Sequence, residues 1–263
     1  MNSPSDNSAA GPVIEFRNVS YRLENGNILL HNLNLEVQRG ETMVLLGRSG
    51  SGKTTTLKLV NHLLAPSSGE VRVQGRSTTE WDVIRLRRSV GYVIQDVGLF
   101  PHFTVQRNVG LVPSIEKWDA TRLESRTSEL LQLVGLDAQL ASRYPHQLSG
   151  GQRQRVGVAR ALAADPPILL MDEPFGALDP LTRVDLQREF LALQKRLDKT
   201  IVFVTHDVRE ALVLGSRIAL MDNGRLLHIH TPREFLNSRD TLIRSYVDSF
   251  QGTGEPSTDR GSS

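Results

Sequence analysis

The 263-residue sequence contains no cysteine, and this absence excludes several chemistries at once. Without thiols the chain cannot form a disulfide framework, use a cysteine nucleophile or bind a metal through cysteine. Aromatic residues are also scarce, at 5% of the chain. Because recognition of a methylated ammonium needs several aromatic rings around one pocket, we do not expect this chain to select such a cation itself.

The chain also lacks a long apolar run and a strong charge bias. No stretch approaches the roughly 18 apolar residues of a membrane-spanning helix. Met1–Pro12 has neither the basic start nor the apolar core of a secretion signal. The formal net charge is only +2, from 31 basic and 29 acidic residues. A nucleic-acid-binding protein usually carries a larger basic excess, so we expect no nucleic acid among the partners.

The composition along the chain indicates one ordered domain with disordered ends. Residues 1–12 and 251–263 are rich in small and polar side chains, which favours disorder. Over the domain between them, 13–250, no linker or internal repeat is visible. The domain begins with β-type patterns, because 13–19 reads as a strand and apolar residues alternate with polar ones over 33–38. We therefore expect an antiparallel β segment at the start.

The pattern then changes to strand, loop and helix. Apolar strands at 42–46, 167–171 and 200–205 are each followed by a loop and a helix. Fully apolar strands that alternate with amphipathic helices predict an α/β fold whose parallel sheet is covered on both faces. The helix after the second of these strands carries an apolar stripe at helical spacing, formed by Leu186, Phe190, Leu193 and Leu197.

Two further segments have distinctive patterns. Phe103–Tyr144 has helical periodicity and no clear strand, so we expect a separate helical lobe there. Asp222-Asn-Gly-Arg225 predicts a hairpin turn that closes the last β segment.

The most specific motif is a phosphate-binding loop between strand 42–46 and the next helix. Gly47-Arg-Ser-Gly-Ser-Gly-Lys53-Thr54 matches G-x-x-x-x-G-K-[ST]. Glycines let backbone N–H groups wrap a phosphate chain, and the helix N-terminus adds a favourable dipole. The alternative is that this segment is only a Gly/Ser-rich connector. A connector would not explain why the complete motif lies between a strand and a helix. Lys53 would contact the β and γ phosphates of ATP. We predict that ATP is bound by Gly47, Arg48, Ser49, Gly50, Ser51, Gly52, Lys53, Thr54 and Thr55.

A second motif places two acids at the end of an apolar strand, at Asp172 and Glu173. Such a strand delivers carboxylates to the edge of the sheet where doubly wound folds bind ligands. Asp172, together with the Thr54 hydroxyl, would hold Mg²⁺, and Glu173 would be the general base that activates the attacking water. An acidic strand end is alternatively a helix cap, but the accompanying phosphate loop favours the catalytic interpretation.

A third motif, Leu148-Ser-Gly-Gly-Gln152, opens another helix and resembles the signature sequence of ABC transporter ATPases. A serine and two glycines at a helix start form a second anion site. The resemblance covers roughly 13–250. It implies a P-loop NTPase core with an antiparallel β subdomain and a helical subdomain at about 103–150. It also implies a head-to-tail homodimer in which each ATP is contacted in trans by Ser149, Gly150, Gly151, Gln152 and Asp179.

The resemblance extends to isolated residues whose order and spacing match the family. Gln95 resembles a glutamine that binds Mg²⁺ or water and senses the membrane subunit, and His206 resembles the switch histidine at the γ-phosphate. The segment from Gly176 to Asp179 resembles the loop that crosses the dimer interface. The family stacks adenine on an aromatic residue, for which Tyr21 is the candidate, although Leu23 occupies the expected position.

Finer resemblance points to importers of quaternary-amine osmoprotectants such as glycine betaine, choline and carnitine. It is carried by the segments 90–102, 108–113 and 160–180. It implies integral-membrane permease subunits as direct partners, a substrate-binding protein as an indirect one, and a peripheral location on the cytoplasmic face of the inner membrane. Many of these ATPases add C-terminal CBS regulatory domains, for which we expect no room here. Arg107 departs from the family pattern, in which an acidic residue precedes the asparagine.

Two alternatives remain at this point. The chain could drive another small-solute or lipid transporter with the same motor. It could instead be a non-transport ABC ATPase that acts on DNA or ribosomes. The short interval between Lys53 and Leu148 disfavours the second alternative, because it leaves no room for a long coiled-coil arm. The single phosphate loop and the near-zero net charge disfavour it further.

Overall fold

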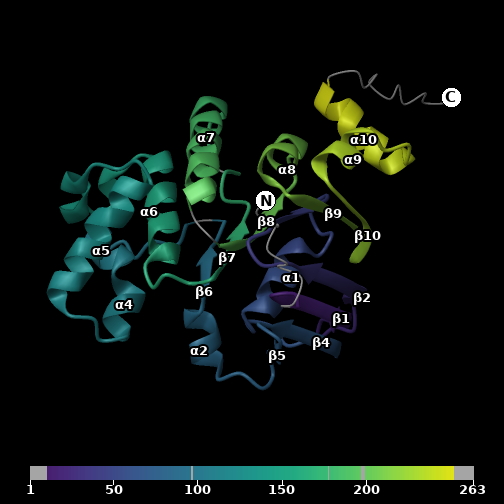
Figure 1. Ribbon diagram of the computed structural model, residues 1–263, viewed down its shortest axis with the longest axis horizontal. Helices are drawn as coiled ribbons and strands as arrows, with labels where there is room; N and C mark the ends of the chain where they lie inside the picture. Colours follow the sequence, from purple (N-terminus) through teal and green to yellow (C-terminus); the bar gives the residue numbers. More distant parts are fainter. Residues whose placement is uncertain (1–10, 96, 177, 197–198, 252–263) are drawn as a thin grey trace, which may run out of the picture.

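The computed structural model describes residues 11–95, 97–176, 178–196 and 199–251 (Figure 1). The disorder expected at the two termini falls almost entirely outside those residues. The same is true of Leu197, the last member of the stripe predicted on one helix.

The first β segment forms an antiparallel four-stranded sheet, as predicted. Its strands pair in the order β2-β1-β4-β5. In β2, Leu33, Leu35 and Val37 are buried and alternate with exposed polar residues, because successive side chains of a strand point to opposite faces. The bounds are β1 Ile14–Arg22, β2 Ile28–Val37, β4 Ser68–Val73 and β5 Arg76–Ser77.

A second sheet of six strands forms the centre of the molecule. Its strand order is β10-β9-β3-β8-β7-β6, and every pair is parallel except β9 with β10. The predicted hairpin turn is confirmed, because Asn223 and Gly224 both have positive φ, at 45° and 73°. The bounds are β3 Thr42–Leu46, β6 Val90–Val93, β7 Ile168–Asp172, β8 Thr200–Thr205, β9 Arg217–Asp222 and β10 Arg225–His230.

Both faces of the parallel strands are covered, as their fully buried sequences predicted. One face packs on α1 (Lys53–Val60) and the antiparallel sheet, where Leu57 and Val60 meet Met43 and Leu170. The other face packs on helices of the later chain, including α7 (Pro180–Arg196) and α8 (Val208–Leu214). Within α7 the buried stripe consists of Leu186, Phe190 and Leu193.

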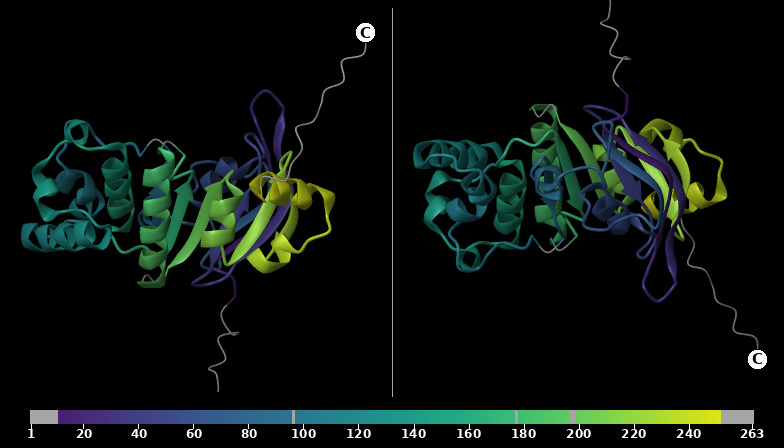
Figure 2. Two further views of the ribbon diagram at one scale, coloured as in Figure 1. Left: turned by 90° about the horizontal axis from the view of Figure 1, so that it is seen from above. Right: turned by 90° about the horizontal axis from the view of Figure 1, so that it is seen from below.

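Helices fill the segment for which a helical lobe was expected. Residues 103–144, all of them described, contain α3 (Val105–Val109), α4 (Leu111–Ile115) and α5 (Ala120–Leu133) and no strand. Two short 3₁₀ helices follow, at Ala138–Ser142 and Pro145–Gln147. Helix α6 (Gly150–Leu162) then packs on α3 and α5. These helices form one end of the elongated molecule in both views of Figure 2.

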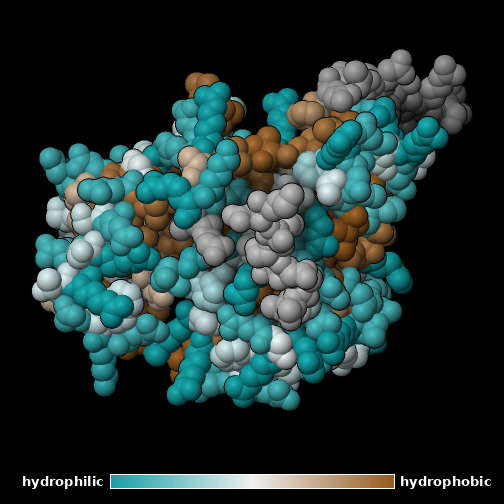
Figure 3. Space-filling model, viewed as in Figure 1, coloured by the Kyte–Doolittle hydropathy of each residue, from teal (hydrophilic) through white to brown (hydrophobic). Residues whose placement is uncertain are grey.

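The remaining helices are α2 (Val83–Arg88), α9 (Pro232–Leu236) and α10 (Thr241–Gln251). Helix α2 contacts the edge strand β6, α9 contacts β9 and β10, and α10 packs on α8 and α9. Among the described residues, no helix is both long and apolar enough to cross a membrane. The face seen in Figure 3 is mostly hydrophilic, with apolar patches near α8 and α10, beside β10 and over the helices at the opposite end.

Candidate functional site

Residues 47–52 connect the end of β3 to the start of α1, and two of their glycines cannot be replaced without strain. Gly52 precedes the helix with φ 97°, and a Cβ added there would lie 2.5 Å from Cδ2 of Leu30. At Gly47 an added Cβ would lie 2.2 Å from the carbonyl oxygen of Met221. The loop therefore packs closely against Leu30 of β2 and Met221 of β9, with no room for a side chain at either glycine.

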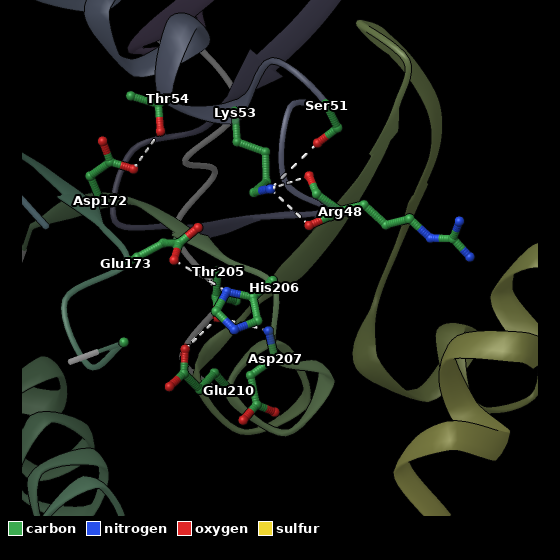
Figure 4. Close-up of polar contacts among 12 residues, drawn as sticks. Arg48, Ser51, Lys53, Thr54, Asp172, Glu173, Thr205, His206, Asp207 and Glu210 are labelled. Carbon is green, nitrogen blue, oxygen red and sulfur yellow. Dashed lines mark hydrogen bonds and ion pairs between the residues drawn. The ribbon is translucent and has the colours of Figure 1, made fainter. Parts of the chain in front are cut away.

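The side chain of Lys53 is buried inside the curve of this loop, with 4% of its surface exposed. Its ammonium donates to the carbonyl oxygens of Gly47 at 2.7 Å and Arg48 at 2.8 Å, and to Oγ of Ser51 at 3.4 Å (Figure 4). Burial lowers the pKa of Lys53, while the charges of Glu173 and Asp172 raise it. A buried cation with only neutral oxygens in contact is well suited to accept a phosphate.

Asp172 ends β7 beside the start of α1 and is 4% exposed. Its Oδ1 accepts a hydrogen bond from the Thr54 hydroxyl at 2.9 Å, and its Oδ2 accepts one from the Tyr92 hydroxyl at 3.3 Å. Burial raises the pKa of Asp172, and these two hydrogen bonds oppose the rise. Burial, followed by the Asp172 charge, also raises the pKa of Tyr92 above its usual range.

This donor set fits Mg²⁺. Hydroxyl and carboxylate oxygens are ligands that Mg²⁺ prefers, and the ion usually takes one or two carboxylates and completes its shell with phosphate oxygens and water. The part of the chain that the structure describes has no group of three or more His, Cys, Asp or Glu side chains that could hold a metal alone. A cation at Thr54 and Asp172 would therefore depend on the nucleotide for further ligands.

Glu173 and His206 face each other across the ends of two neighbouring strands. Oε2 of Glu173 lies 3.2 Å from Nδ1 of His206. The Glu173 backbone N–H donates to the carbonyl oxygen of Val204 at 3.0 Å, which fixes the residue to the strand that leads into His206. Glu173 has φ 44°, in the left-handed region that non-glycine residues rarely occupy. Its side chain is 20% exposed, so the carboxylate can reach a water molecule.

A cavity of about 660 Å³ joins these groups, a size suited to a nucleotide. It brings together the phosphate loop and all three residues predicted to be catalytic, Gln95, Glu173 and His206. Ser51 does not line the cavity, but its hydroxyl accepts a hydrogen bond from the ammonium of Lys53, which does. The wall is formed by Leu29, Gly47, Arg48, Ser49, Gly50, Gly52, Lys53, Thr54, Thr55, Gln95, Glu173, His206 and Tyr246.

The wall also contains two residues that the sequence did not predict, Leu29 and Tyr246. Leu29 precedes the buried Leu30 in β2, and Tyr246 comes from α10, near the end of the chain. Tyr21, the candidate for adenine stacking, is not among the lining residues. It pairs with Leu30 in the antiparallel sheet, and its ring packs, partly buried, against the core beside that sheet.

The residues predicted to act in trans do not line this cavity. Ser149 caps α6, where its Oγ accepts from the N–H of Gln152 at 3.2 Å and its own N–H donates to Oε1 of Gln152 at 2.9 Å. Asp179 is exposed, and hydrogen bonds from the side chain and the N–H of Thr182 lower the pKa of Asp179. Gly151 is buried, and an added Cβ would lie 2.8 Å from Cγ2 of Thr182.

Comparison with known proteins gives a consistent result. A family model described as ABC transporter matches residues 30–176. The glycine betaine uptake system ATP-binding protein YehX of Escherichia coli is 51% identical over 92% of this chain and 78% of its own length. The choline transport ATP-binding protein OpuBA of Bacillus subtilis is 48% identical over 89% of this chain. The osmoprotectant import ATP-binding protein OsmV of Salmonella typhimurium is 51% identical over 84%.

The chain spans only part of some of these relatives, 62% of OpuBA and 57% of OsmV. Among solved structures, the dimeric ATP-binding cassette MJ0796 bound to ADP and phosphate has a TM-score of 0.75 and 36% identity. That match covers 84% of this chain and 99% of MJ0796. The cbiO1 protein of Clostridium perfringens, part of the cbiONQ transporter complex, has a TM-score of 0.80 and 26% identity. It covers 92% of this chain and 98% of cbiO1.

Proposed function

The chain belongs to the ABC transporter family, and from that premise we propose that it is the ATP-hydrolysing subunit of an importer for quaternary-amine osmoprotectants. The observation that carries the hydrolytic part is the single cavity in which Lys53, Glu173 and His206 meet. An ATP whose phosphates lie along the loop would place its γ-phosphate near all three residues.

In the proposed reaction, the N–H groups of the loop and the Lys53 ammonium bind the β and γ phosphates. Glu173 accepts a proton from the attacking water, because its carboxylate is partly exposed at the phosphate end of the cavity. His206, in contact with that carboxylate, orients the base and donates to a γ-phosphate oxygen. Thr54, Asp172 and Gln95 would hold Mg²⁺, which supplies positive charge to the two phosphates when bound.

We further propose that two copies of the chain complete two sites. Ser149, Gly150, Gly151 and Gln152 open α6 away from the cavity of their own chain, so they could reach a nucleotide only on a second copy. Close to Asp179, Leu181 is 80% exposed and offers an apolar side chain that a second copy could cover. Two solved structures of MJ0796 are dimeric, which supports a dimer for this chain as well.

The transported solute is inferred from relatives whose names include glycine betaine and choline uptake. This chain would not bind the solute itself, because aromatic residues make up only 5% of it. Recognition would belong to a substrate-binding protein, and the permease would dock near Gln95 and the helical lobe. There Arg107 stacks on the ring of Phe103, at 3.8 Å from the ring centroid. The chain would then lie peripherally on the cytoplasmic face of the inner membrane.

Uptake and ATPase measurements test this proposal. Deleting the gene should abolish uptake of labelled betaine, choline or carnitine in high-salt medium. If the deletion strain still took up all three solutes, the proposed solute class would be wrong, while the proposed ATP hydrolysis would stand. With permease and loaded binding protein present, ATP hydrolysis should rise above its basal rate. Gln95→Ala should blunt that rise more than ATP binding, whereas Gln38→Ala, at an exposed glutamine beyond β2, should not.

A further inference from the structure

Arg183, near the start of α7, contacts two loops that each carry a proposed catalytic residue. One amino group of its guanidinium donates to the carbonyl oxygens of Gly176 at 3.4 Å and Leu178 at 3.3 Å. The other amino group faces Oδ2 of Asp207 at 3.8 Å. The first loop begins at Glu173, and Asp207 directly follows His206.

The first loop is tied closely to the proposed base. The N–H of Gly176 donates to the carbonyl oxygen of Glu173 at 3.1 Å, so a displacement of Gly176 pulls on the backbone of Glu173. The same loop continues to the exposed Asp179, where we propose that a second copy makes contact. Arg183 therefore binds a segment that has the proposed base at one end and a proposed intersubunit residue at the other.

The second loop is anchored to a buried carboxyl group. The N–H of Asp207 donates to Oγ1 of Thr205 at 2.9 Å, and that hydroxyl donates to Oε2 of Glu210 at 2.5 Å (Figure 4). Glu210 is 4% exposed, and its other oxygen accepts from Nε2 of Gln187 at 3.1 Å. Because Gln187 and Arg183 are both on α7, this helix holds the residues around His206 at two points.

These two attachments differ in strength. The Gln187 hydrogen bond is 3.1 Å long and ends on a carboxyl group that is 4% exposed, whereas the Arg183 and Asp207 side chains are 28% and 26% exposed and their charged atoms are 3.8 Å apart. An ion pair of this length between two partly exposed side chains contributes little stability. It can therefore open and close without unfolding its surroundings. Nε of Arg183 is buried without a hydrogen-bond partner among the described residues, so the guanidinium retains a donor for a different arrangement.

We infer that Arg183 is a positioning residue that transmits movement of the loop after Glu173 to His206. When a second copy presses on Asp179, the carbonyl groups of Gly176 and Leu178 move, and the guanidinium moves with them relative to Asp207. His206 then changes its position against Glu173 and the γ-phosphate. This inference rests on the proposed ATPase function and makes hydrolysis depend on the partner.

The test compares Arg183→Gln with Arg188→Gln. Arg188 lies on the same helix and pairs with Asp185 at 3.9 Å, but both side chains are well exposed and face neither loop. Arg183→Gln should lower kcat about 3- to 10-fold, as expected for loss of a half-exposed charge contact. Its KM for ATP should stay within about twofold, because no phosphate contact is lost. Arg188→Gln should match the parent chain, and Arg183→Lys, which keeps the charge, should recover part of kcat.

A double-mutant cycle with Asp207→Asn separates positioning from general damage. Asparagine retains the cap of α8, in which Oδ1 of Asp207 accepts from the N–H of Arg209 at 2.7 Å, and removes only the charge that faces Arg183. The double variant should be no slower than the slower single variant. Multiplicative losses, or an Arg183→Gln kcat equal to that of Arg188→Gln, would overturn the inference.

The proposed function fails in a distinguishable way. If the parent chain does not hydrolyse ATP, or if Glu173→Gln hydrolyses it normally, the function itself is wrong. If the parent is active, Glu173→Gln is inactive and the cycle is multiplicative, only the role of Arg183 is wrong. ATP-driven dimerisation of Glu173→Gln should persist when Arg183→Gln is added, since the contact acts on the reaction step.

Discussion

Replacing Glu173 by glycine should make the protein more stable than the alanine variant while abolishing its turnover. The reason is the backbone, because Glu173 has φ 44° and every residue with a Cβ pays a steric penalty there. Glycine has no Cβ and occupies this region freely. Alanine removes the same carboxylate but keeps the Cβ, so the two variants differ only in the backbone term.

The magnitude follows from two opposing effects. Relief of the left-handed penalty is worth about 1–2 kcal/mol, whereas the freer unfolded chain of a glycine variant costs about 0.5–1 kcal/mol. The loss of the contact with His206 is common to both variants, and His206 is 58% exposed. The net difference lies between about 0 and 1.5 kcal/mol, and its midpoint of about 0.75 kcal/mol corresponds to a Tm higher by about 2–3 °C for the glycine variant.

Thermal unfolding without nucleotide measures this difference, and phosphate release measures turnover. Both variants, and also Glu173→Gln, should lose about 10²–10⁴ in kcat, as expected when a positioned base is removed. A glycine variant no more stable than the alanine variant would show that residue 173 is not strained. Near-normal turnover by Glu173→Gln would show that Glu173 is not the base.

Three further predictions follow from individual contacts. Lys53→Ala should weaken ATP binding itself, in a nucleotide titration, because it removes the buried cation of the loop; unchanged affinity would contradict that assignment. Gly150→Asp should block hydrolysis in homodimers but regain activity when mixed with Lys53→Ala chains, whereas Gly150→Asn should be mild; position 150 is exposed, and an added Cβ has only ordinary contacts. Burial raises the pKa of Glu210, so its contribution to stability is full at low pH and is lost as the pH rises through that raised pKa. In urea titrations, Glu210→Gln should therefore gain stability relative to the parent as the pH rises above the usual range of a glutamate pKa, and a constant difference in the free energy of unfolding would refute this.

The parts of the fold that were predicted correctly depend on local rules. The loop between β3 and α1 was predicted because the G-x-x-x-x-G-K-[ST] pattern occurs between a strand and a helix. The turn at Asn223–Gly224 was identified because only a few residue types tolerate two consecutive positive φ angles. The parallel strands were identified because burial on both faces leaves no polar alternation, and β7 is buried at every residue.

The parts that were missed depend on distant contacts. Tyr246 reaches the cavity from α10, which packs against α8 and α9, and nothing in the sequence near Tyr246 indicates this. Leu29 enters the wall because β2 runs beside the phosphate loop, where Gly52 approaches Leu30. Burial raises the pKa of the Tyr246 hydroxyl and neighbouring Arg48 opposes the rise, which further supports its proximity to the loop.

The strained backbone of Glu173 can be explained by its position directly after Asp172 at the end of β7. Asp172 and Glu173 are consecutive at the end of a strand, and consecutive side chains of a strand point to opposite faces. Asp172 follows this rule and turns toward Thr54, where it is buried and hydrogen-bonded. If Glu173 also followed it, its carboxylate would point away from the phosphate end.

The left-handed backbone conformation of Glu173 interrupts this alternation of side chains. The hydrogen bond from its N–H to the carbonyl oxygen of Val204 keeps Glu173 beside the strand that leads to His206. Two carboxylates with different surroundings thereby lie close to the same loop: Glu173 lines the cavity, and Asp172 lies behind it, hydrogen-bonded to the lining residue Thr54. The buried one is suited to hold a cation, and the partly exposed one to accept a proton. A chain that relieved this strain would lose the second carboxylate from the site, so the strain is a requirement of the chemistry we propose.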